Sequence, residues 1–212
     1  MAAFLRNFSR FLFCFFVAVV TIQAQAQMAE WKFRNPLPQG NRLKDVFFVN
    51  SQTGWSVGFT GTILKTTNAG TTWQIQNSGT FSDLNSVHFL DAQNGWVAGA
   101  DGTVIHTTDG GDSWQMQNTD VTITLNSIVF TDTQTGWAAG ALGSILKTTD
   151  GGNYWVAQTS GTNKTLSCLF FLNNLTGWAS GNAGTILKTV DGGITWASLT
   201  SGIANGIPSI CF

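Results

Sequence analysis

The chain has 212 residues, enough for one ordinary domain, and its 10 Lys and Arg against 11 Asp and Glu leave a net charge of −1. Only 10% of the residues are charged, so the sequence lacks the basic surface that a nucleic-acid partner requires. Composition therefore excludes nucleic acid as a partner.

The first 26 residues are expected to be a secretory signal peptide. Arg6 and Arg10 precede an apolar run at 11–22, and the tripeptide AQA at 24–26 offers small residues for cleavage. The run is shorter than the roughly 20 residues that span a bilayer as a helix; an uncleaved anchor is the alternative. We therefore expect export to the periplasm, the cell surface or the exterior, with no membrane span after signal removal.

The rest of the chain, 28–212, consists of repeats. A unit such as GWVAGADGTVIHTTDGGDSW (95–114) recurs at intervals of 41 residues. Each unit contains four short β-branched or aromatic stretches separated by turns rich in Gly, Asn and Asp, and no stretch has helical periodicity. We expect complete units at about 43–79, 84–118, 125–161 and 166–202, and a partial fifth unit from 207.

An antiparallel unit of four strands and about 40 residues has the size of one β-propeller blade. We therefore predict an all-β propeller whose blades bury tryptophans between them. The glycines at 58, 99, 140 and 181 are expected at a bulge or a close backbone approach. Eight of the 9 tryptophans fall at two repeat positions, Trp55, Trp96, Trp137 and Trp178 on the second strand, and Trp73, Trp114, Trp155 and Trp196 on the fourth.

The ninth tryptophan bears on how the chain is organised at its ends. Trp31 stands 42 residues before Trp73 and predicts a lone fourth strand, of the kind that completes the last blade when a propeller closes. The segment 207–212 supplies only a first strand. We expect a truncated copy of a longer protein; a four-blade propeller with a short tail is the alternative.

The turn before each fourth strand follows the Asp-box pattern, Ser or Thr, any residue, Asp, any, Gly, any, Thr, Trp. We call these segments (66–73, 107–114, 148–155 and 189–196) the Asp-box turns. In such a turn the acidic side chain accepts backbone N–H groups and the Trp fixes the fourth strand to the core. The acidic position holds Asn68, Asp109, Asp150 and Asp191, and the Trp position holds Trp73, Trp114, Trp155 and Trp196.

Four Asp-box turns, each in register with a preceding Gly-Trp, resemble those of the BNR propellers of the photosystem II stability and assembly-factor type. The resemblance implies a non-enzymatic scaffold that binds another protein. One carboxylate per turn falls short of the 6–8 oxygens that calcium takes. We expect no metal and no cofactor.

Asp-box propellers also include sialidases and other glycosidases, which typically need a pair of carboxyl groups. Glu30, next to the signal peptide, is the one Glu of the sequence, and the sole Tyr, Tyr154, lies inside an Asp-box turn. We therefore expect no catalytic residues. Two alternatives stay open: a carbohydrate-binding or glycosidase-type propeller whose site lies outside this chain, and a structural or adhesive module of a larger surface protein.

His88, His106 and the two cysteines outside the signal peptide are interpreted as structural. A metal site needs several converging ligands, and we expect the polar tip of His106 to point outward. Cys168 and Cys211 are expected to be buried thiols.

The turns between second and third strands and the links between units differ most among the repeats. Because variable loops carry recognition while a scaffold holds them, we predict that they form one rim of the propeller, which binds a protein partner; loops without a role are the alternative. The candidate residues are Phe59, Thr60, Phe81, Asp101, Val121, Ile123, Leu142, Asn163, Lys164 and Asn182.

Overall fold

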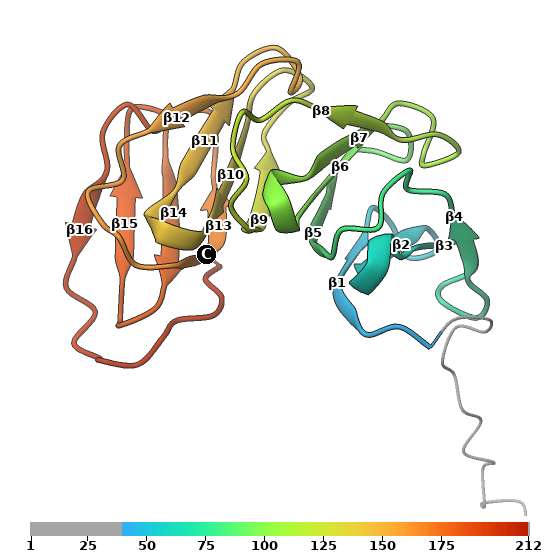
Figure 1. Cartoon of the computed structure of the whole chain (residues 1–212), viewed down its shortest axis with the longest axis horizontal. Helices are drawn as coiled ribbons and strands as arrows, with labels where there is room; N and C mark the ends of the chain where they lie inside the picture. The colour runs from blue at the N-terminus through green and yellow to red at the C-terminus, as the bar shows by residue number, and fades with distance from the viewer. Residues whose placement is uncertain (1–39, 212) are drawn as a thin grey trace, which may run out of the picture. The chain divides into compact units, whose positions relative to one another are not determined.

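A computed structural model describes residues 40–211, so the predicted signal peptide and the predicted strand at Trp31 lie outside the described residues. The described chain forms four antiparallel sheets of four strands each, and in every sheet neighbouring strands follow the order of the sequence (Figure 1). The predicted all-β fold with four-stranded units is confirmed.

The strand bounds repeat from sheet to sheet. The first sheet contains β1 (Leu43–Phe48), β2 (Gly54–Gly58), β3 (Ile63–Thr66) and β4 (Gln74–Gln76). The second contains β5 (Leu84–Phe89), β6 (Gly95–Gly99), β7 (Val104–Thr107) and β8 (Gln115–Gln117). The third contains β9 (Leu125–Phe130), β10 (Gly136–Gly140), β11 (Ile145–Thr148) and β12 (Val156–Gln158). The fourth contains β13 (Leu166–Phe171), β14 (Gly177–Gly181), β15 (Ile186–Thr189) and β16 (Ala197–Leu199). Short 3-10 turns, η1 (Phe59–Gly61), η2 (Ala100–Gly102) and η3 (Ala141–Gly143), join the second and third strands of the first three sheets.

Consecutive sheets contact each other mainly through their first strands. β1 contacts β5, β5 contacts β9, and β9 contacts β13. The fourth strand of each sheet lies at the opposite edge and exposes apolar side chains such as Ile75 and Met116. This arrangement, with first strands innermost and fourth strands outermost, is that of propeller blades.

Tryptophan–phenylalanine stacks form the core between sheets. Trp55 stacks on Phe89 with ring centroids 3.6 Å apart, and the same pair recurs as Trp96–Phe130 and Trp137–Phe171, each at 3.7 Å. These three tryptophans are fully buried. Each Phe of these pairs also meets the Asp-box Trp of its own sheet edge-on. Each phenylalanine is thus contacted by two tryptophan side chains, one from the preceding sheet and one from its own sheet. These contacts join each sheet to the next.

The glycine that ends each second strand permits a close backbone approach. A Cβ atom at Gly99 would lie 2.2 Å from the Asp83 carbonyl oxygen. The register of β5 against β6 also shifts between Leu84 and Ser86. Both predicted reasons for glycine are therefore present, and Gly58, Gly140 and Gly181 have equally close carbonyls.

The described residues after β16 continue along the fourth sheet without forming a strand. The Ile207 N–H donates to the Gly181 carbonyl at 2.8 Å, and the Cys168 sulfur lies 3.8 Å from the Ile210 carbonyl oxygen. Cys168 is half-buried and Cys211 is exposed, so the prediction of two buried thiols was wrong for Cys211. Its segment contacts Cys168 of β13 and Gly181 of β14.

Candidate functional site

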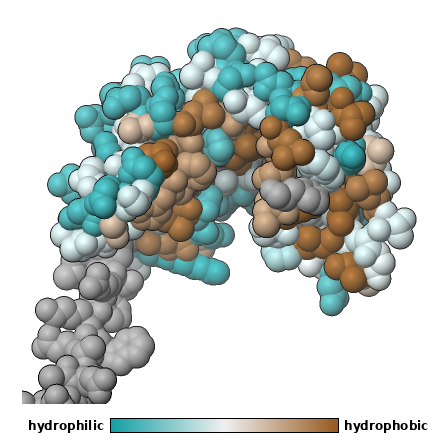
Figure 2. Space-filling model, turned by 180° about the vertical axis from the view of Figure 1, so that it is seen from behind, coloured by the Kyte–Doolittle hydropathy of each residue, from teal (hydrophilic) through white to brown (hydrophobic). Residues whose placement is uncertain are grey.

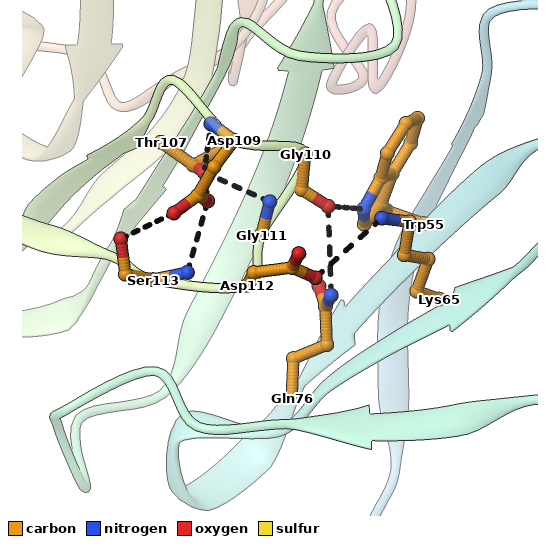
Figure 3. A network of polar contacts seen from close by, with 9 residues as sticks. All are labelled: Trp55, Lys65, Gln76, Thr107, Asp109, Gly110, Gly111, Asp112 and Ser113. Carbon is orange, nitrogen blue, oxygen red and sulfur yellow. Dashed lines mark hydrogen bonds and ion pairs between the residues drawn. The ribbon is translucent and has the colours of Figure 1, made fainter.

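Each Asp-box turn is held together by the side chain at its acidic position, as Figure 3 shows for Asp109. One oxygen of Asp109 accepts the Ser113 N–H at 2.9 Å, and the other accepts the Ser113 hydroxyl at 2.6 Å. The Thr107 hydroxyl donates to Asp109 at 2.7 Å and accepts the Gly111 N–H at 2.8 Å. Gly110 and Gly111 have φ values of 72° and 91°, which glycine adopts readily.

These hydrogen bonds stabilise the ionised carboxylate. The Ser113 hydroxyl, followed by the Ser113 N–H, holds the pKa of Asp109 well below its usual range. The Thr195 hydroxyl does the same at Asp191 and lowers its pKa to about 2. Asn68 forms the equivalent bond without a charge, because its side-chain oxygen accepts the Thr72 N–H at 2.9 Å. The acidic side chains are therefore engaged within their own turns.

The Asp-box turn also binds the preceding sheet. The Trp55 indole N–H donates to the Gly110 carbonyl at 3.0 Å, and the Gln76 amide lies 3.5 Å from the same oxygen (Figure 3). The Lys65 ammonium lies 5.6 Å from the centre of the Trp55 ring. The same indole bond recurs from Trp96 to Gly151 and from Trp137 to Gly192. The turn is thus an acceptor for a tryptophan of the neighbouring sheet.

Substituting Asp109→Asn is expected to leave stability at pH 7 within about 1 kcal/mol of the wild type, since Asn68 already forms this turn. Because the folded-state pKa of Asp109 is lowered, its carboxylate stabilises the fold above about pH 4, and that contribution is lost as the pH falls. The variant should therefore lose less stability than the wild type below pH 4. Urea unfolding at several pH values measures this, and parallel curves for the two proteins would contradict it.

A groove of about 680 Å³ follows the first strands. Each strand contributes a half-buried side chain to its wall: Phe47, His88, Val129 and Phe170. Burial lowers the pKa of His88 to about 4, so its ring is neutral at pH 7. Asp45 also lines the groove; burial raises the pKa of its carboxyl group, which accepts the Val87 N–H at 2.9 Å. No group of three or more His, Cys, Asp or Glu side chains within residues 40–211 is placed to hold a metal ion.

The loops form two separate rims. On one rim the Asp-box turn bonds to the connection between first and second strands, as from the Gly110 N–H to the Gln93 carbonyl at 2.9 Å. On the other, the turn between second and third strands bonds to the link leading to the next sheet, as from the Gly102 N–H to the Ile123 carbonyl at 2.8 Å. We call this second set, the turns 59–61, 100–102, 141–143 and 182–184 with the links 79–83, 120–124, 161–165 and 202–206, the loop rim.

The structure places the ten candidate residues on the loop rim with different exposures. Phe59 is half-buried beneath the Lys44 ammonium, which lies 4.9 Å from its ring centre. Val121 and Ile123 are half-buried and pack against the core between the second and third sheets. The exposed candidates are Thr60, Phe81, Asp101, Leu142, Asn163, Lys164 and Asn182.

Three of these exposed residues have a left-handed backbone. Thr60, Asp101 and Leu142 have φ values of 52°, 54° and 57°, each followed by a glycine that is also left-handed. Asp-Gly suits such a two-residue hairpin turn, whereas a branched side chain there is strained by about 1–2 kcal/mol. Leu142 is nevertheless 70% exposed. It borders a shallow depression of about 660 Å³ that Asn163 and Thr162 also line.

His106 differs from its sequence interpretation. Its ring stacks on Trp96 at 4.5 Å, and its Nε2 atom is buried without a hydrogen-bond partner, so the expectation of an outward tip was wrong. The flat imidazole of His106 lies on the indole. In the other repeats a lysine at this position places its ammonium group over the equivalent indole. The sequence analysis did not predict the groove along the first strands. The signal was present in β1, because side chains two residues apart, such as those at 45 and 47, lie on the same face of a strand.

No helix in the described part of the chain has the length and apolar character that crossing a bilayer requires. Four consecutive four-stranded meanders, joined through their innermost strands by buried tryptophans, define a β-propeller. The sequence profile of the family described as photosynthesis system II assembly factor YCF48 matches residues 23–121 and 113–208. The chain therefore belongs to this family.

Solved structures show the same fold. The structure of YCF48 bound to D1 peptide is 22% identical over 81% of this chain and 71% of that one, with a TM-score of 0.54. An ancestral GH74 enzyme is 21% identical over 76% of this chain and 24% of its own, with a TM-score of 0.61. The GH74 enzyme of Niastella koreensis is 18% identical over 74% and 30%, with a TM-score of 0.63. Among curated proteins, no sequence matches this chain.

Proposed function

We propose that this protein is a non-enzymatic, exported propeller that binds a polypeptide segment of a partner protein through its loop rim. Membership of the assembly-factor family supports a binding role, as does the structure of YCF48 bound to D1 peptide. Export is supported by the basic, apolar and small-residue pattern of residues 1–26.

One observation carries the placement on the loop rim: large apolar side chains are exposed there, one of them in a strained backbone conformation. Phe81 is 92% exposed and Leu142 is 70% exposed. Leu142 is also held in a left-handed conformation that glycine would occupy without strain. Strained backbone clusters at functional sites, where the surrounding structure imposes it, and exposed apolar patches mark interaction sites.

The GH74 neighbours favour the alternative of a carbohydrate-active propeller, but the described carboxyl groups support it less. Rim carboxylates are engaged by rim donors: Asp83 accepts the Thr60 N–H at 3.0 Å, and Asp101 lies 3.4 Å from the Ser82 hydroxyl. Asp109, Asp150 and Asp191 bind within Asp-box turns. A glycosidase needs a carboxyl pair facing one sugar bond.

The test is peptide binding to the loop rim. We expect the full chain to bind peptides from a displayed library that includes a D1 peptide, and the double variant Phe81→Ser, Leu142→Gly to bind them at least tenfold more weakly. The variant should remain folded, because glycine relieves the strain at residue 142. Ile194→Ser, a matched control with a 72% exposed side chain on an Asp-box turn, should bind normally.

Two results would contradict the proposal. One is that the full chain binds no peptide. The other is that it binds or hydrolyses an oligosaccharide and that the double variant loses this activity. For export, the protein recovered outside the cytoplasm should begin at Gln27, which N-terminal sequencing determines. Retention of the intact N-terminus in the cytoplasm would refute that part of the proposal.

A further inference from the structure

Three exposed positions of the fourth repeat hold aliphatic residues where the other repeats hold polar ones. Leu175 is 59% exposed, Val190 is 64% exposed and Ile194 is 72% exposed. We call these three residues the aliphatic patch, and Figure 2 shows hydrophobic surface on the side of the molecule that the fourth sheet forms. The equivalent residues in the earlier repeats are Gln134, Gln93 and Gln52 for Leu175, Thr149, Thr108 and Thr67 for Val190, and Asn153, Asp112 and Thr71 for Ile194.

The exposure of the aliphatic patch is a property of these repeat positions. All nine equivalent polar residues are exposed as well, in sheets that have a following sheet beside them. The Asp-box turn also forms with polar residues there, as the turn around Asp109 shows. Folding of the repeat therefore does not account for three large aliphatic side chains on this surface.

The aliphatic patch lies on one continuous part of the rim that the Asp-box turns form. The Gly192 N–H donates to the Leu175 carbonyl at 2.8 Å, which joins the two segments that carry the patch. The Asn174 amide donates to the Asp132 carboxylate at 2.8 Å and links them to the third sheet. The Asp-box turn of the third sheet carries Tyr154, which is 62% exposed where the other repeats have Thr or Ser.

The backbone around the patch already has hydrogen-bond partners within the chain. The Leu175 N–H donates to the Asn173 side chain at 2.9 Å. The Gly193 N–H donates to the Thr189 hydroxyl at 2.8 Å, and the Thr195 N–H donates to Asp191 at 2.9 Å. Because paired backbone groups lose little when water is removed, such turns can enter a medium of low polarity.

The charges beside the patch are balanced. The Asp191 carboxylate is held in its own turn by the Thr195 hydroxyl at 2.6 Å. The Lys147 ammonium lies 5.4 Å from the centre of the Trp137 ring, and a Cβ atom at Gly192 would lie 2.9 Å from it. One negative and one positive group at the base of an apolar surface complement lipid headgroups that also carry one charge of each sign.

We propose that the aliphatic patch inserts into the surface of a bilayer of zwitterionic lipids, with Tyr154 at the level of the headgroups. Aliphatic side chains supply the apolar contact, and tyrosine is enriched at membrane–water interfaces. Protein interfaces favour aromatic residues, Met and Arg seated in pockets, whereas these side chains are aliphatic and project from turns. Three side chains also fall short of the roughly 800 Å² per partner that a stable interface between two copies takes.

Insertion would leave the loop rim free, because the loop rim lies at the opposite ends of the strands from the Asp-box turns. The proposal therefore goes beyond peptide binding and is tested without a peptide. The probe is unilamellar vesicles of phosphatidylcholine, with binding of the full chain measured by sedimentation.

The decisive variant is the triple substitution Leu175→Gln, Val190→Thr, Ile194→Asn. It installs the residues that the third repeat holds at these positions, so it should keep the wild-type urea midpoint. We expect it to bind the vesicles about tenfold more weakly than the wild type. Residues 1–26 are the same in both chains, so the difference reports the patch. Phe81→Ser, which removes an exposed side chain of the loop rim, is the matched control and should bind vesicles normally.

Methyl NMR of the full chain locates the contact. Spin-labelled lipid in the vesicles should broaden the methyl signals of Leu175, Val190 and Ile194, and it should leave those of Leu142 on the loop rim unchanged. Adding phosphatidylglycerol should alter the affinity by less than about twofold, because the patch has no excess of basic groups.

Three results would overturn the proposal. The first is that the triple variant binds vesicles as the wild type does. The second is that spin-labelled lipid leaves the patch methyl signals unchanged. The third is that the wild type binds only vesicles that contain a membrane protein, because the patch would then be a protein-binding surface. Peptide binding to the loop rim, measured without lipid, is independent of all three.

Discussion

Replacing Trp96 with alanine is expected to lower the free energy of unfolding by about 3–5 kcal/mol, the largest effect of any single substitution considered for this fold. Trp96 is fully buried between the second and third sheets, stacks on Phe130 and bonds to the Gly151 carbonyl. The variant loses the contacts of the ring and leaves a buried carbonyl without its donor. Because repeats are stabilised largely by their neighbours, it also weakens the coupling between the two pairs of sheets.

Chemical denaturation followed by far-UV circular dichroism measures this effect and shows whether the single transition splits in two. Trp96→Phe retains a ring but not the N–H, so it should cost less than the alanine variant. Trp178→Ala is the matched control, since Trp178 is half-buried and its substitution should cost less than that of Trp96. A loss below about 1 kcal/mol for Trp96→Ala would contradict the role assigned to the tryptophans.

The sequence was most informative where a feature recurs at a fixed interval. The fully buried Trp55, Trp96 and Trp137 are each predicted by position alone, because a repeat that cannot bury its own apolar faces must bury them against the next. The division of the loops into two rims follows from the same alignment, since equivalent turns occupy equivalent places. The resemblance to the assembly-factor family was recognised from the Asp-box turns, because their residues lie close together in the sequence.

Features that depend on contacts between units were not predictable in the same way. The left-handed backbone of Leu142 contradicts the local preference of leucine and is imposed by the hairpin. His106 occupies a lysine position, but its stacking on Trp96 depends on the shape of the neighbouring indole. The groove beside Phe47 and His88 requires four first strands to be placed together, which no single strand specifies.

Gly99→Ala is expected to lower the free energy of unfolding by about 3 kcal/mol, although it adds one methyl group. The backbone at Gly99 is extended, with a φ of −159°, so alanine carries no conformational penalty there. The cost comes from the Asp83 carbonyl oxygen, which would lie 2.2 Å from the new Cβ. The oxygen belongs to the main chain, and the position of a Cβ atom is fixed by the backbone, so no side-chain rotation relieves the overlap.

Relief of this overlap would require the link before β5 to move away from β6, which breaks the bond from the Ala100 N–H to the Asp83 carbonyl at 2.8 Å. Gly40→Ala is the matched control, because a Cβ atom at Gly40 meets nothing within 4 Å. Its unfolding free energy should stay within about 0.5 kcal/mol of the wild type. Equal effects of the two substitutions would show that the glycine at the end of each second strand is not required by close packing.

Because Asp83 also accepts the Thr60 N–H, the displaced link should in turn alter the loop rim. Gly99→Ala should therefore weaken peptide binding even where the chain remains folded.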